Sequence, residues 1–196
     1  MHQALSARVR ALILTGAASI FSPVVAADAD ADPGAGAALR DLIDAASHRL
    51  ALADQVALSK WDSGKPVDDP AREKLVIDAA VSKARALGVS VERAADVFTD
   101  QVEANKFVQY RLLAQWRRVG AAPAAARPDL VLDIRPKLDG IQARLIDGLL
   151  HTGQLPARDD CARRVARAVG AYVDEKNMDP LHGMALDRAM ARVCEK

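Results

Sequence analysis

Two cations, Arg49 and Lys60, stand in a stretch of the chain that is otherwise mostly apolar, HRLALADQVALSKW at residues 48–61. On a helix, residues eleven positions apart lie within about 20° of each other, roughly 16 Å apart along the axis, so both cations share one face. The nearby acids Asp44 and Asp54 point away from that face. Burial of an unpaired charge is costly, so this pattern predicts that an anion binds here. The alternative is that each cation reaches solvent at the rim.

Polar residues interrupt the apolar faces of other expected helices in the same way. Asn105 and Gln109 lie one turn apart inside an apolar stripe, and Arg135 lies on the apolar face of a later helix. Asp69 and Arg72, at i and i+3, open another helix. Each has an ordinary alternative: a satisfied core amide pair, a helix cap or a solvated arginine. Together they predict a cationic pocket inside a helical bundle.

Such a pocket suits a small dianion, because arginine binds carboxylates strongly where water is excluded. The sequence shows no inward Ser, Cys or His set beside a base, no cluster with metal-ligand spacing and no glycine-rich phosphate loop. We expect His48, His151 and His182 to lie at the surface. The chemistry should therefore need no cofactor or metal, only binding, orientation and electrostatics.

The elements that position these residues should all be helices. The 196-residue chain is 51% hydrophobic, largely Ala and Leu, and only 4% aromatic. This composition favours an all-α, single-domain bundle of about six helices. Capping and breaking residues place the predicted helices at 38–61, 70–87, 90–118, 129 or 133 to 150, 160–176 and 180–195.

The chain begins like an exported protein. A basic start, an apolar run and small residues predict a signal peptide over 1–27, followed by a flexible leader over 28–37 and the folded domain over 38–196. The apolar run is too short and too interrupted to span a membrane. The expected location is therefore periplasmic or secreted.

Removal of Arg8 and Arg10 with the signal peptide leaves 25 basic and 26 acidic residues, a net charge of −1. This balance does not indicate nucleic-acid binding. Export places Cys161 and Cys194 where disulfides persist, so we expect them to pair; the alternative is two buried free thiols.

This pattern resembles the secreted, all-helical chorismate mutases, the γ-type class of that family. The positions that carry the resemblance are Arg49, Lys60-Trp61, Asp69, Arg72, Asn105 and Gln109, with a later arginine and two C-terminal cysteines. The resemblance implies a chorismate mutase II-like fold. It also implies conversion of chorismate to prephenate by an intramolecular [3,3] rearrangement, without a cofactor.

The resemblance further implies a role for each polar position. Arg49 and Arg135 would bind the two carboxylates of chorismate, and Asn105 would support this anion site. Lys60 and Gln109 would donate hydrogen bonds to the ether oxygen, where negative charge builds as its bond to the ring breaks.

Asp69 and Arg72 would hold the hydroxyl end of the ring.

The chain departs from the family pattern at two positions. Gln109 stands where secreted relatives often have a glutamate, and Asn105 stands where a hydroxyl residue is common. An amide donates at any ordinary pH, whereas a glutamate must first be protonated.

The resemblance suggests a homodimer, and the length of the chain suggests that each subunit contains its own complete site. Two alternative functions remain. One is an isochorismate pyruvate lyase on the same fold. The other is a non-catalytic exported helical protein that binds a dicarboxylate or a partner through its bundle.

Overall fold

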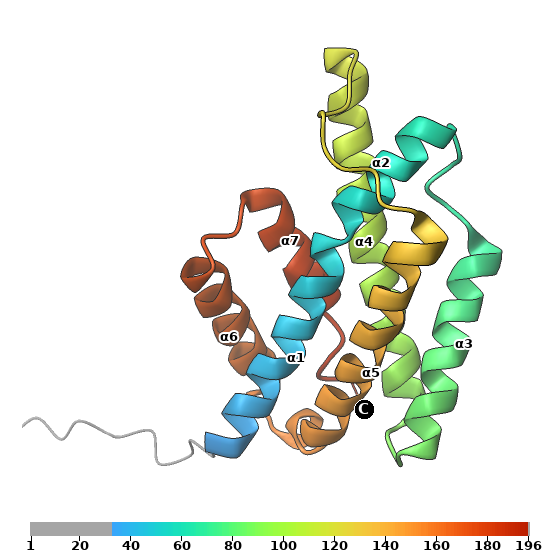
Figure 1. Cartoon of the computed structure of the whole chain (residues 1–196). Coiled ribbons are helices and arrows are strands. Elements are labelled where there is room, and N and C mark those ends of the chain that lie inside the picture. The colour runs from blue at the N-terminus through green and yellow to red at the C-terminus, as the bar shows by residue number, and fades with distance from the viewer. Residues whose placement is uncertain (1–32, 196) are drawn as a thin grey trace, which may run out of the picture. The chain divides into compact units, whose positions relative to one another are not determined.

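The computed structural model describes residues 33–195, and within them the chain forms helices and turns but no strand (Figure 1). The predicted all-α class is confirmed. The predicted signal peptide, residues 1–27, lies outside the described residues. The α-helices are α1 (Pro33–Ala51), α2 (Ala53–Ser63), α3 (Pro70–Ala86), α4 (Val91–Val119), α5 (Arg135–His151), α6 (Cys161–Glu175) and α7 (Pro180–Ala189). Two short elements are the π-helix η1 (Leu130–Ile134) and the 3₁₀-helix η2 (Leu155–Ala157).

The single helix predicted over 38–61 is wrong in one respect, because it is divided at Leu52 into α1 and α2. The amide of Leu52 donates to the carbonyl oxygen of Arg49 at 3.3 Å, three residues back rather than four. This tighter turn interrupts the regular helix just after Arg49. Helix α1 also begins at Pro33, inside the segment predicted as a flexible leader.

Local capping explains where α3 and α4 begin. The Asp69 carboxylate accepts a hydrogen bond from the Arg72 amide at 3.1 Å, which caps α3. The hydroxyl of Ser90 accepts from the Arg93 amide at 3.2 Å and caps α4, as predicted. Between the two helices Gly88 takes a positive φ of 75°, a conformation that favours glycine. These caps fix the residues at which the two neighbouring helices begin.

Asp129, rather than Asp133, opens the fourth predicted helix. Its carboxylate accepts from the amides of Val131 and Leu132, both at 2.7 Å. The first turn that it caps is the π-helix η1, and the regular helix α5 starts only at Arg135. The wider π turn was not predicted from the sequence.

The core lies where α1 packs against α5 and where α4 packs against α2, α3 and α7 (Figure 1). Helices α1 and α5 approach closely at Gly148, where an added Cβ would lie 3.0 Å from the Leu42 side chain. The largest fully buried side chains include Phe98, Leu50 and Leu145. None of the helices within residues 33–195 combines the length and apolar character that a membrane span requires.

The C-terminal segment is fastened to the bundle by a disulfide and by a buried carboxylate. Cys161 and Cys194 are bonded, with Cα atoms 5.9 Å apart, so the predicted pairing is confirmed. Asp100, fully buried on α4, accepts hydrogen bonds from the backbone and guanidinium of Arg192. The helix predicted over 180–195 is too long, because α7 ends at Ala189 and turns follow.

His182 is not the surface residue that the sequence predicted. Its side chain is only 15% exposed and lies between Asp54, 3.1 Å from Nε2, and Asp179, 2.7 Å from Nδ1. The hydrogen bond to Asp54 and the charges of both carboxylates raise the pKa of His182 to about 9, although burial opposes this. The imidazolium therefore links the start of α7 to the start of α2.

This link predicts how stability depends on pH. The pKa of His182 rises from 6.5 to about 9 on folding, so its contribution is fully present below pH 6.5 and is lost as the pH rises through 9. Urea unfolding of the wild type should show this decrease between pH 6 and 9.5. The His182→Gln variant should lack that component of the decrease. Equal pH dependence in both proteins would contradict the link.

Candidate active site

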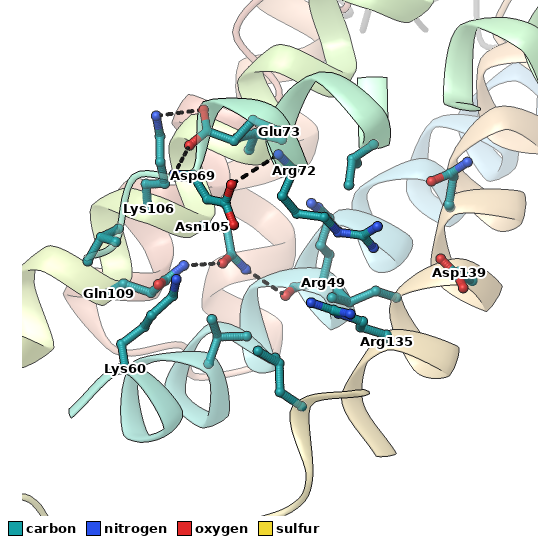
Figure 2. Close-up of a pocket in the computed structure, with 17 residues that line it drawn as sticks. Arg49, Lys60, Asp69, Arg72, Glu73, Asn105, Lys106, Gln109, Arg135 and Asp139 are labelled. Atoms are coloured by element: carbon teal, nitrogen blue, oxygen red, sulfur yellow. Dashed lines mark hydrogen bonds and ion pairs between the residues drawn. The ribbon is translucent and has the colours of Figure 1, made fainter. Parts of the chain in front are cut away.

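One pocket brings together all seven residues that the sequence singled out (Figure 2). They come from five helices and from the residue that caps α3. The predicted residues that line the pocket are Arg49, Lys60, Asp69, Arg72, Asn105, Gln109 and Arg135. The regular helices α2 and α4 carry three of them, while the others lie at the end of α1 or at the starts of α3 and α5. The uncompensated cations on separate helices therefore face one common space.

Arg49 is the most deeply buried of the cations, with 7% of its surface exposed. Its Nε atom is buried and has no hydrogen-bond partner among the residues that the structure describes. Burial, and secondarily the charge of Arg72, lower the pKa of Arg49 to about 10. The guanidinium thus stays charged at neutral pH in a place where its charge is unfavourable.

The other predicted cations likewise have no ion-pair partner within residues 33–195. In the part of the chain that the structure describes, the side chains of Lys60, Arg72 and Arg135 make no ion pair within 4.0 Å. The charged side chains that line the pocket are five cations and three acids: Arg49, Lys60, Arg72, Lys106 and Arg135 against Asp69, Glu73 and Asp139. The pocket therefore carries a net charge of +2, which complements a dianion.

The two carboxamides form a short hydrogen-bonded chain that ends at Arg49. Gln109 Nε2 donates to Asn105 Oδ1 at 2.8 Å, and Asn105 Nδ2 donates to the backbone oxygen of Arg49 at 3.3 Å. Both side chains are buried, but Gln109 Oε1 has no partner within residues 33–195. The two amides are therefore not an ordinary core pair, because one buried amide oxygen lacks a hydrogen bond among the described residues. The second N–H of Gln109 remains available to a ligand.

Sequence reasoning assigned no role to several other lining residues. Glu73 and Lys106 face each other across the space between α3 and α4, with Glu73 Oε2 and Lys106 Nζ 3.1 Å apart. Gln142 and Asp139 line the α5 side. The apolar part of the wall is formed by Val56, Val67, Val76, Val102, Leu130 and Leu138. Glu73 directly follows Arg72 in the sequence, and Lys106 directly follows Asn105. This adjacency to predicted residues is the one sequence feature that could have indicated their place in the pocket.

The donor set of the pocket is guanidinium, ammonium and carboxamide, which suits anions rather than metal ions. Within residues 33–195 no three His, Cys, Asp or Glu side chains lie close enough together to hold a metal ion. The arrangement can bind a dianion and place hydrogen-bond donors around it. Electrostatic stabilisation of charge that develops on a bound molecule requires this kind of arrangement.

The chain is similar to known proteins along most of its length. The family model for chorismate mutase type II matches residues 40–110, a range that contains six of the seven predicted residues. The secreted chorismate mutase of Mycolicibacterium smegmatis is 33% identical over 92% of this chain and 96% of that protein. The secreted chorismate mutase of Mycobacterium tuberculosis is 28% identical over 80% and 78%.

Solved structures of chorismate mutases also match most of this chain. Chorismate mutase from Burkholderia phymatum is 47% identical, with a TM-score of 0.79 over 83% of this chain and 99% of that chain. The enzyme from Burkholderia thailandensis is 37% identical, with a TM-score of 0.77 over 80% and 99%. Sequence, fold and pocket charge agree, and the chain belongs to the family of secreted, all-helical chorismate mutases.

Proposed function

We propose that this protein is an exported chorismate mutase that converts chorismate to prephenate without a cofactor. The observation that carries the proposal is the pocket's net charge of +2, with Arg49 buried and unpaired among the described residues. Chorismate has two carboxylates, so it supplies the partners that these cations lack. The family relationship supports the same activity.

The reaction needs only positioning and electrostatics. Within one molecule, the bond between the ether oxygen and the ring breaks while a carbon–carbon bond forms, and no proton or electron leaves the substrate. Negative charge builds on the ether oxygen in the transition state. Lys60 Nζ and the free N–H of Gln109 are the donors that we assign to this oxygen.

The remaining residues hold the substrate in a compact, reactive conformer. We assign Arg49 and Arg135 to the carboxylates. Asn105 supports this anion site by donating a hydrogen bond from its side chain to the backbone oxygen of Arg49. Asp69 and Arg72 are assigned to the hydroxyl end of the ring. Asp69 Oδ1 already caps α3 by accepting from the Arg72 amide, so the helix cap also fixes the position of this end of the pocket.

Export is supported by the predicted signal peptide, by the disulfide and by relatives named as secreted enzymes. A complete site in each subunit is supported by the pocket, because all seven assigned residues come from a single chain. Homodimerisation remains part of the proposal and follows only from the resemblance. Size-exclusion chromatography with light scattering would test it.

Purified protein should consume chorismate in buffer that contains EDTA and no cofactor. The measurement is the loss of chorismate absorbance, with prephenate identified as the product. A rate no higher than that of the buffer would overturn the proposal. Incubation with isochorismate, followed by assay for pyruvate, separates the lyase alternative; binding without turnover of either substrate would indicate the non-catalytic alternative.

Gln109→Glu should change the pH profile of the enzyme. The wild-type amide donates throughout the ordinary pH range, so activity should be nearly flat on the acid side. In the variant only the protonated carboxyl group donates, and activity should fall as the pH rises. Initial rates between pH 4.5 and 8.5 would show the difference. A flat profile in a folded variant would remove Gln109 from the ether-oxygen role.

A further inference from the structure

A second charged group, built around Lys106, lies at the edge of the pocket. The Lys106 ammonium is 2.8 Å from Glu103, 3.1 Å from Glu73 and 3.3 Å from Asp68, and its side chain is only 15% exposed. Burial lowers its pKa, but the hydrogen bonds to Glu103 and Glu73 raise that pKa overall. Lys106 therefore stays charged.

Of the three carboxylates around Lys106, only Glu73 lines the pocket. Figure 2 shows it held from two sides, by Lys106 and by the backbone at Asp69. Glu73 Oε1 accepts from the Asp69 amide at 3.0 Å, while Oε2 accepts from the ammonium at 3.1 Å. A carboxylate has about four acceptor positions, so Glu73 keeps unused acceptors beside the end where Asp69 and Arg72 lie.

A carboxylate in the wall of a pocket for a dianion needs compensation. An unpaired Glu73 would repel the substrate, and a mobile one would be drawn to the neighbouring unpaired cation of Arg72. In the latter position it would compete with the substrate for that cation. Lys106 prevents both effects, because it is the only cation within 4.0 Å of Glu73 among the described residues.

We propose that Lys106 is a positioning residue of the substrate pocket, which acts by holding and neutralising the Glu73 carboxylate. This inference rests on the proposed function. It concerns substrate binding more than the chemical step, because Lys106 is assigned no contact with the reacting atoms. The consequence should therefore be a change in KM with kcat largely preserved.

The experiment is a double-mutant cycle on the full-length protein. Lys106→Met should raise the KM for chorismate about tenfold, as expected for the loss of one charge-assisted hydrogen bond, with kcat within about threefold of the wild type. Lys106→Arg should restore most of the affinity. In a Glu73→Gln background, Lys106→Met should change KM less than about threefold, because the charge on which it acts is gone.

Two matched controls separate this role from a general loss of charge. Lys74→Met removes an exposed lysine of α3 that is also paired with a carboxylate, Asp78 at 2.6 Å, outside the pocket. Glu103→Gln removes a partner of Lys106 that does not line the pocket. Both should leave KM within about twofold of the wild type. Lys106→Gln provides a second variant if the methionine variant is unfolded.

The proposal would be overturned if Lys106→Met changed KM by the same factor in the wild type and in the Glu73→Gln background. An effect no larger than that of Lys74→Met would also overturn it. Failure of the proposed function looks different, because the wild type itself would then not consume chorismate. Melting temperatures of all variants identify an effect that is only structural, which would lower stability without the predicted KM pattern.

Discussion

Lys60→Met should lower the kcat for chorismate by a factor of about 10² to 10³, the size expected when a donor to developing negative charge is removed. Lys60 lines the pocket and has no ion-pair partner among the described residues, so its charge is available to the substrate. Because the charge on the ether oxygen develops in the transition state, kcat should fall more than KM rises. Steady-state kinetics on chorismate would measure both.

Lys65→Met is the matched control for this variant. Lys65 is an exposed lysine just beyond α2 that does not line the substrate pocket. Its replacement should leave kcat within about twofold of the wild type, as for an ordinary surface charge. If Lys60→Met kept wild-type kcat with its fold intact, Lys60 would have no role in stabilising the transition state.

Arg49→Met should lower kcat/KM by a factor of about 10² to 10³, because truncation of one partner in a desolvated charge pair costs 2 to 5 kcal/mol or more. Much of this loss should appear in KM, since Arg49 is assigned to a substrate carboxylate that is charged before and during the reaction. Arg49→Lys should recover only part of the loss, because lysine cannot make the two parallel hydrogen bonds of a guanidinium. Full kcat/KM in Arg49→Met would contradict its assignment to a carboxylate.

Helical periodicity was enough to predict the residues that face the pocket from regular helices. Lys60, Asn105 and Gln109 lie within α2 and α4, where 3.6 residues per turn fix the direction of each side chain. That Arg49 and Arg135 meet them was inferred from charge, since inward cations without counter-ions indicate a shared anion site. The fold class and the disulfide followed from composition and from the predicted export.

Some of the features that were missed depend on contacts between segments distant in the sequence. Glu73 and Lys106 pair across α3 and α4, so their place in the pocket depends on the register of two helices rather than on the pattern within one. His182 is held by a hydrogen bond to Asp54, 128 residues earlier in the chain. The break at Leu52 changes the local hydrogen bonds without any Gly or Pro beside it to signal the change. The π turn before Arg135 did have a signal, because Pro136 lacks an amide hydrogen and is placed best in the first turn of a helix, so α5 starts beside it.

Thermal unfolding of ligand-free protein shows whether Arg49 lacks a counter-charge in the empty pocket, because an uncompensated buried cation must lower stability. Arg93 is the matched control: it is also buried, but its guanidinium donates to Val193, Leu149 and Thr152. Arg93→Met should therefore lower the melting temperature, whereas Arg49→Met should raise it by about 3 °C or more. Saturating prephenate, the dianionic product, should then raise the melting temperature of the wild type more than that of Arg49→Met. A ligand-free Arg49→Met variant that melts below the wild type would mean that Arg49 is already compensated before substrate binds.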